Sequence, residues 1–101
     1  MDYLDKMLKL QGEFQAKFAF HPPLHRVASA IMTEAGELWE ASEGKWWTRK
    51  KHTDEERREE LVDILHFFLS YCVEMGISPR ELFGLYARKL AVNYQRQFEE
   101  Y

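Results

Sequence analysis

The helical spacing of apolar residues constrains the fold of this 101-residue chain more than any other feature. Apolar residues recur every three or four positions almost throughout, and no stretch keeps the alternation of an amphipathic strand. His21-Pro22-Pro23 interrupts the pattern, because proline lacks an N–H donor and restricts the residue before it. Gly44 and Gly76 end the second and third segments. The pattern predicts an all-α fold with helices over about residues 2–18, 24–43, 53–76 and 78–97.

Capping sequences support two of these boundaries. Thr53 is followed three residues later by Glu56, which is the pattern of a capping box. Ser78-Pro79-Arg80-Glu81 supplies an N-cap, a proline in the first turn and a glutamate at the third position. Because the connections are short, we expect the helices to pack as a compact four-helix bundle. The chain length favours a single domain over residues 1–101.

Composition argues against several classes of protein. The net charge of −3 disfavours general electrostatic binding to duplex nucleic acid. Cys72 is the single cysteine, so neither an intrachain disulfide nor a CxxC metal motif is available. The N-terminal segment lacks the apolar core of a signal peptide, and the most apolar window, ILHFFLSYCV, is too short to span a bilayer. We therefore expect a soluble, cytoplasmic protein with no membrane partner.

Four acidic residues occupy paired positions in the second and third helices. Glu34 and Glu37 are three residues apart, as are Glu60 and Asp63, so each pair shares a helix face. A short connection makes the two helices antiparallel neighbours, so we expect the four carboxylates to converge. Two like charges about 5 Å apart repel by roughly 3 kcal/mol at an effective dielectric constant of about 20. A divalent cation with oxygen ligands would offset this repulsion, and such ligation suits Mg²⁺, with Mn²⁺ as an alternative.

A simpler interpretation of the third helix stays open at this point. The helix is apolar nearly all round, which is typical of a buried helix. Its one polar stripe consists of Glu60, Asp63, His66, Ser70 and Glu74. Without a functional site, this stripe would be the side that faces solvent.

The fourth helix carries a polar stripe that includes positive charge. Tyr86, Lys89, Asn93 and Arg96 are spaced so that they fall on one helix face. Lysine offers a point charge and arginine a planar fork, and both bind phosphate. The alternative is a solvated basic face. Carboxylates, a metal ion and a basic stripe together indicate a site for a polyphosphate.

The spacing of these residues resembles that of the all-α NTP pyrophosphohydrolases, a superfamily that includes MazG-like enzymes, dCTP pyrophosphatases and dimeric dUTPases. Glu34-x-x-Glu37, followed after 22 residues by Glu60-x-x-Asp63, is similar to the ExxE…ExxD signature. Further similarities favour the dimeric dUTPase branch: Lys45-Trp46-Trp47, Asp63-Ile64-Leu65-His66-Phe67, Tyr86-x-x-Lys89-x-x-x-Asn93-x-x-Arg96-Gln97, and Gln11 at the position of a base-contacting glutamine. Thr33, Thr48 and Gln15 depart from the family pattern, which bears on base selectivity more than on the chemistry.

The resemblance implies Mg²⁺-dependent hydrolysis of a nucleoside triphosphate, with dUTP as the first candidate, to the monophosphate and pyrophosphate. It implies four metal ligands, Glu34, Glu37, Glu60 and Asp63, and we interpret Glu37 as the general base. The substrate contacts that it implies are Gln11, Lys45, Trp47, His66, Lys89, Asn93 and Arg96, with Trp46 as the alternative to Trp47 for stacking on the base.

Two other functions stay open at this stage. One is the same chemistry on dCTP or another, modified nucleotide, and the other is a non-enzymatic helical interaction module. The resemblance further implies assembly as a homodimer or a dimer of dimers, with sites at or near subunit boundaries. Hydrophobic residues make up 46% of the chain, and such a small bundle has apolar surface to spare for an interface.

Overall fold

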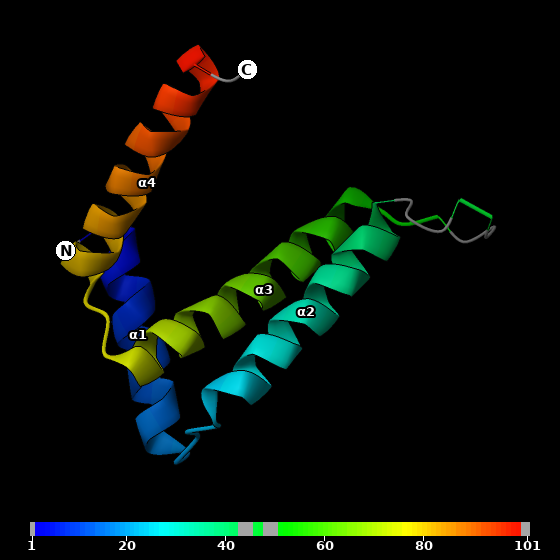
Figure 1. Cartoon of the computed structure of the whole chain (residues 1–101). Coiled ribbons are helices and arrows are strands. Elements are labelled where there is room, and N and C mark those ends of the chain that lie inside the picture. Colours follow the sequence, from blue (N-terminus) through cyan, green and yellow to red (C-terminus); the bar gives the residue numbers. More distant parts are fainter. Residues whose placement is uncertain (1, 43–45, 48–50, 100–101) are drawn as a thin grey trace.

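Four helices make up nearly all of the structure, a computed structural model that describes residues 2–42, 46–47 and 51–99 (Figure 1). The described residues contain no strand, so the prediction of an all-α, four-helix fold is confirmed. The helices are α1 (Tyr3–Lys17), α2 (Leu24–Ala41), α3 (Asp54–Met75) and α4 (Pro79–Glu99).

The helix ends follow the capping signals in the sequence. Thr53 Oγ1 accepts a hydrogen bond from the Glu56 amide at 3.1 Å, and Ser78 Oγ accepts one from the Glu81 amide at 3.1 Å. Gly76 ends α3 with a φ of +69°, a left-handed conformation that glycine adopts without a steric cost. The predicted end of α2 was two residues too late, since α2 ends at Ala41, and Gly44 lies outside the described residues.

Helices α2 and α3 form an antiparallel pair, as predicted (Figure 1). Arg57 of α3 joins the two helices near their connection, because its Nη1 donates to the carbonyl oxygen of Ala41 at 3.0 Å. This bond satisfies a carbonyl group that the end of α2 leaves without a helical partner. Arg57 also forms an ion pair with Asp54 in its own helix. The hydrogen bond from Arg57 to Ala41 holds α2 and α3 in alignment at the end of the pair where their acidic residues lie.

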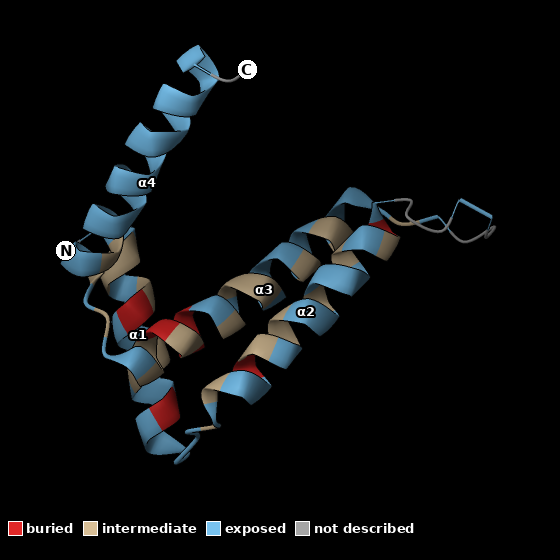
Figure 2. Cartoon of the chain, viewed as in Figure 1, coloured by how far each residue is buried: buried red, intermediate tan, exposed pale blue. Residues whose placement is uncertain are grey.

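The small core lies where α1 packs against the second half of α3 (Figure 2). Leu8 of α1 meets Leu69 and Cys72 of α3, and all three are buried. Leu82 at the start of α4 packs against this cluster. Burial raises the pKa of the Cys72 thiol, which disfavours the reactive thiolate.

Helix α4 extends away from the α2–α3 pair and contains no buried residue (Figures 1 and 2). The prediction that α3 is a buried helix was correct for part of it, since Leu69, Ser70 and Cys72 are buried whereas Leu61, Val62 and Phe68 are exposed. The physical reason is that α1 and α2 cover two sides of α3, while α4 does not close over the remaining side.

Among the described helices, none by itself is long and apolar enough to cross a membrane. Helices α3 and α4 taken together have the length and composition of a membrane span, but the pair is bent by 113°.

Candidate active site

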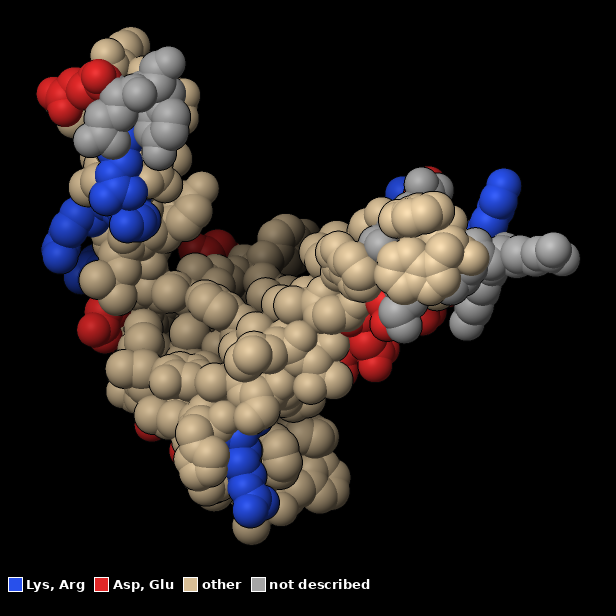
Figure 3. Space-filling view, turned by 45° about the vertical axis from the view of Figure 1, so that its right-hand side comes forward, with Lys and Arg blue, Asp and Glu red and all other residues tan. Residues whose placement is uncertain are grey.

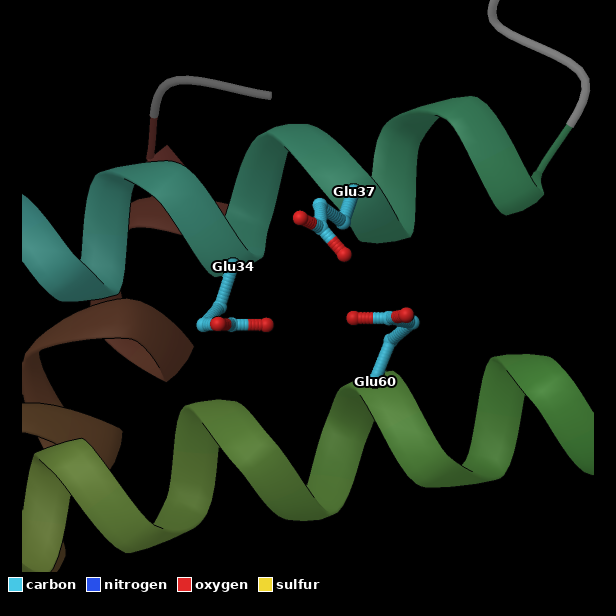
Figure 4. A group of neighbouring side chains, drawn as sticks. All are labelled: Glu34, Glu37 and Glu60. Atoms are coloured by element: carbon cyan, nitrogen blue, oxygen red, sulfur yellow. The ribbon is translucent and has the colours of Figure 1, made fainter.

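Three carboxylates converge between α2 and α3 (Figure 4). Glu34 and Glu37 project from one face of α2, and Glu60 projects toward them from α3. One oxygen atom from each carboxylate lies within 4.8 Å of the others. The three-residue spacing on α2 and the antiparallel packing of α3 together produce this arrangement.

Glu60 is the most perturbed member of this cluster. Its pKa is raised above its ordinary value, first by desolvation and then by the negative charge of Glu37, with smaller effects from Glu34 and Asp63. Its Oε2 atom is buried and has no hydrogen-bond partner among the described residues. Glu34 and Glu60 can share a hydrogen bond only when one of the two carboxylates is protonated. Protonation of Glu60 or a bound cation would offset the negative charge that the fold concentrates here.

The residues present fit a hard divalent cation. Each of the three glutamates offers oxygen ligands, which Mg²⁺ and Mn²⁺ prefer. The buried, unpartnered Oε2 atom of Glu60 is a ligand that the protein itself does not satisfy. Glu37 is exposed while Glu34 and Glu60 are half-buried, so the cluster is open to solvent on the Glu37 side.

Asp63 occupies a different place from the other three predicted ligands. It is exposed and is not among the carboxylates whose oxygens meet within 4.8 Å. Its negative charge nevertheless contributes to the raised pKa of Glu60, so the two carboxylates are near neighbours on α3. The structure thus brings together three of the four predicted metal ligands and leaves the fourth beside them.

A cavity of about 770 Å³ lies between α1 and α3. Gln11 and His66, both predicted substrate contacts, line it, together with apolar side chains such as Phe14 and Leu65. A volume of this size is typical of sites for small molecules and cofactors. The polar stripe of α3 connects the carboxylate cluster with this cavity, because it runs from Glu60 in the cluster to Ser70 in the cavity wall.

A hydrogen-bonded network that the sequence did not predict lies at the edge of this cavity. Gln11 Nε2 donates to Gln15 Oε1 at 2.8 Å, and Gln15 Nε2 donates to Glu74 Oε1 at 2.8 Å. His21 Nδ1 lies 2.8 Å from the same oxygen of Glu74. Gln15 is fully buried although it is polar. The four-residue spacing of Gln11 and Gln15 was the available signal, but nothing in the sequence pairs Gln15 with Glu74.

The polar stripe of α4 does not reach the carboxylates in the described part of the chain. Lys89, Asn93 and Arg96 are exposed, and the contacts of α4 with another helix are with α1. Figure 3 shows Lys and Arg side chains along the arm formed by α4, with a hollow between this arm and the α2–α3 pair. Tyr86 of the same stripe is 62% exposed.

The remaining predicted contacts lie in the connection between α2 and α3. Lys45 lies outside the described residues. Trp46 and Trp47 are both exposed, and their rings meet edge to face with centroids 5.8 Å apart. Exposed indole rings of this kind are available to stack on a base or to pack in an interface.

Comparison with known proteins identifies the family. A family model described as dUTPase matches residues 2–82, which include both helices of the carboxylate cluster. The chain belongs to this dUTPase family. The chain also resembles the dCTP pyrophosphatase of Enterobacteria phage T4, with 36% identity over 80 residues, covering 67% of this chain and 44% of the phage protein. It also resembles the dCTP pyrophosphatase of Enterobacteria phage LZ5, with 43% identity over 42 residues that cover 42% of this chain and 24% of that protein.

The match to these two phage proteins is partial. The chain spans less than half the length of either phage protein. No solved structure matches the chain. The dUTPase family match ends at residue 82, so it includes the carboxylate cluster and the cavity but not most of α4.

Proposed function

We propose that this chain hydrolyses nucleoside triphosphates to the monophosphate and pyrophosphate, in a reaction that depends on Mg²⁺ or Mn²⁺. The observation that carries the proposal is the convergence of Glu34, Glu37 and Glu60 within 4.8 Å, in a chain of the dUTPase family. The unpartnered Oε2 atom of Glu60 supports a cation as the missing component. A non-enzymatic helical module would have no need for a buried carboxylate oxygen without a donor.

In this proposal, Glu34, Glu37 and Glu60 hold the metal, and Asp63 completes the ligand set from its neighbouring position on α3. A divalent ion bound there supplies Lewis-acid chemistry, since it polarises phosphate oxygens and offsets developing negative charge. Glu37 also accepts a proton from the attacking water, because it is the exposed member of the cluster. A general base needs access to the water that it deprotonates, and the two half-buried glutamates have less of it.

The substrate chain is proposed to extend from the carboxylates toward the α1–α3 cavity. The base occupies the cavity, where Gln11 and His66 contact it, and Trp47 or Trp46 covers it from the connecting segment. Ser70 and Glu60 are ten residues apart on α3, which places them about 15 Å apart along the helix axis. An extended nucleoside triphosphate spans a comparable length.

We place dUTP first among the substrates, and dCTP second. The dUTPase family match favours dUTP. The two phage relatives are both dCTP pyrophosphatases, which favours dCTP. Purified protein with Mg²⁺ should release pyrophosphate faster from one of these two nucleotides than from dTTP, dATP or dGTP. Equal release from all five would contradict selectivity for dUTP or dCTP, and no release from any would contradict the proposed reaction.

The basic stripe of α4 is proposed to contact phosphates at a subunit boundary. Lys89, Asn93 and Arg96 are exposed, and α4 leaves a hollow beside the α2–α3 pair (Figure 3). The radius of gyration is 16.5 Å, against about 13 Å for a compact chain of about 100 residues. Apolar side chains of α3 and α4 are exposed, including Val62, Phe68 and Leu90. A homodimer, or a dimer of dimers, would cover this surface.

The oligomeric state is measured by light scattering during size-exclusion chromatography. We expect a dimer or a tetramer at micromolar concentration. A protein that is active as a monomer would contradict the placement of the α4 stripe at a subunit boundary.

Lys45, which lies outside the described residues, is proposed to join Lys89 and Arg96 in holding phosphates.

A further inference from the structure

Arg57 joins three parts of the chain around the connection between α2 and α3 through one guanidinium group. Its Nη1 atom donates to the carbonyl oxygen of Ala41 at 3.0 Å and to that of His52 at 3.3 Å. Its Nη2 atom forms an ion pair with Asp54. These acceptors belong to the end of α2, the segment before α3 and the first turn of α3. Because a guanidinium group carries several donors in a rigid plane, one side chain holds the three parts together.

These contacts lie one helical turn from the carboxylate cluster on both helices. Ala41 follows Glu37 by four residues on α2, and Arg57 precedes Glu60 by three residues on α3. Residues three or four apart are neighbours on one helix face. The hydrogen bond between Arg57 and Ala41 therefore joins the same two faces as the cluster, about 6 Å away along α2 and about 4.5 Å away along α3.

Side-chain packing holds the cluster end of the α2–α3 pair less firmly than the other end. The structure describes both helices throughout, and the buried residues of α2 are Val27 near its start and Ala41 at its end. On α3, the first buried residue is Leu69, nine residues after Glu60. A region with few buried apolar contacts opens more easily than a packed core. The spacing of the two helices beside the carboxylates therefore depends strongly on the polar contacts of Arg57.

We propose that Arg57 is a positioning residue that sets the separation between the two α2 carboxylates of the cluster and Glu60 on α3. The affinity of the cluster for a divalent cation follows from this separation. The inference rests on the proposed function and deepens it, because it names a residue outside the ligand set that tunes the metal site. Arg57 does not bind the metal itself, since a guanidinium group has no acceptor. Removing a contact that orients metal ligands typically weakens metal binding by about 10–100-fold.

The first measurement is the distance between α2 and α3 in the metal-free protein. Ala35→Cys and Glu59→Cys place nitroxide labels at exposed positions on the two helices, and pulsed EPR measures the distance between the labels. Cys72 is buried, so its thiol reacts slowly by comparison. The labelled chain is mixed with an excess of unlabelled chain, so that distances within one chain dominate in any oligomer.

In Arg57→Met, we expect the distribution of distances to widen or shift, because the cluster end of the pair loses all three contacts. Arg57→Lys should have the same effect, since a single ammonium group does not reproduce the planar fork. Arg58→Met is the matched control, since it removes the same charge from an exposed position next to Arg57 and should keep the wild-type distribution. A side chain that only stabilised the fold would lower the melting temperature and leave the distances in the folded protein unchanged.

The second measurement is the dissociation constant for Mn²⁺, obtained with unlabelled protein from the EPR signal of the free ion. It should rise about tenfold in Arg57→Met and in Arg57→Lys, and stay unchanged in Arg58→Met. If Arg57→Met does not fold, Arg57→Lys decides the question, because it keeps the charge and most of the aliphatic stem.

Wild-type distances in Arg57→Lys, or a wild-type Mn²⁺ affinity despite altered distances, would overturn the proposal. A wild-type protein that binds no Mn²⁺ would contradict the proposed function. The distances in the metal-free protein would then decide by themselves whether Arg57 positions the carboxylates.

Discussion

Glu60 and Glu74 lie on the same helix and are both half-buried, yet the fold supplies them with different partners. Glu74 Oε1 lies 2.8 Å from Gln15 Nε2 and 2.8 Å from His21 Nδ1. Glu60 faces two other carboxylates, and its Oε2 atom has no hydrogen-bond partner among the described residues. The difference shows that burial alone does not define a ligand site. The supply of donors separates a glutamate that the protein has already satisfied from one whose buried oxygen has no donor.

The largest effect that this comparison predicts is the loss of turnover in Glu37→Gln. The substitution removes a proposed metal ligand and the proposed base, and general-base catalysis alone contributes about 10²–10⁴-fold. Pyrophosphate release from the preferred nucleotide should fall at least about 100-fold, while the metal-free protein melts at the same temperature as the wild type or higher, since repulsion is relieved. Glu59→Gln on the exposed side of α3 is the control and should keep its activity. A wild-type rate of pyrophosphate release in Glu37→Gln would contradict the proposed role of Glu37 as metal ligand and base.

Glu74→Leu should have the opposite profile, with its main effect on stability. It removes the nearer acceptor of the buried Gln15 amide and leaves only the Phe20 carbonyl oxygen at 3.3 Å, and such a loss costs about 1–3 kcal/mol. For a chain of this size, each 1 kcal/mol lowers the melting temperature by about 4–8 °C. Thermal unfolding is measured without metal and at one protein concentration, with Glu60→Gln alongside it. If Glu60→Gln destabilised the metal-free protein as much as Glu74→Leu does, the two glutamates would play the same structural role.

The sequence predicted those parts of the molecule that depend on local interactions. The caps at Thr53, Ser78 and Gly76 lie where the sequence placed them, because each depends on residues within one turn. The meeting of Glu34, Glu37 and Glu60 was also predictable, since it needs little more than helical spacing and antiparallel packing.

The parts that the sequence did not predict depend on angles and contacts between helices. Gln15 and Glu74 are 59 residues apart, and their contact exists because α1 crosses the second half of α3. Ser70 belongs to a polar stripe that would face solvent if α1 packed elsewhere, but it is buried. Helical spacing showed that α3 has apolar residues on nearly every side, but it did not show which side α4 leaves open.

A smaller effect is expected at the end of α3, two residues beyond Glu74. Gly76 has a φ of +69°, and a Cβ added there meets no atom within 4 Å, so backbone strain is the main cost. Gly76→Ala should therefore lower stability by about 1–2 kcal/mol, and Gly76→Asn by less, since asparagine tolerates this conformation better. Urea unfolding measures both. A loss in Gly76→Ala as large as in Glu74→Leu would indicate that the helix end, and not the network, determines the stability of this region.

The smallest expected effect is the pH dependence of stability without metal. The pKa of Glu60 in the folded chain is raised above its ordinary value of 4.5, so the folded state holds this proton more tightly than the unfolded state. The stabilisation is complete below about pH 4.5 and is lost as the pH rises through the folded-state pKa. The free energy of unfolding of the wild type, minus that of Glu60→Gln, should therefore fall across this range when both are measured in EDTA. A difference that rises with pH would mean that donors satisfy Glu60 as they satisfy Glu74, and the contrast between the two ends of α3 would disappear.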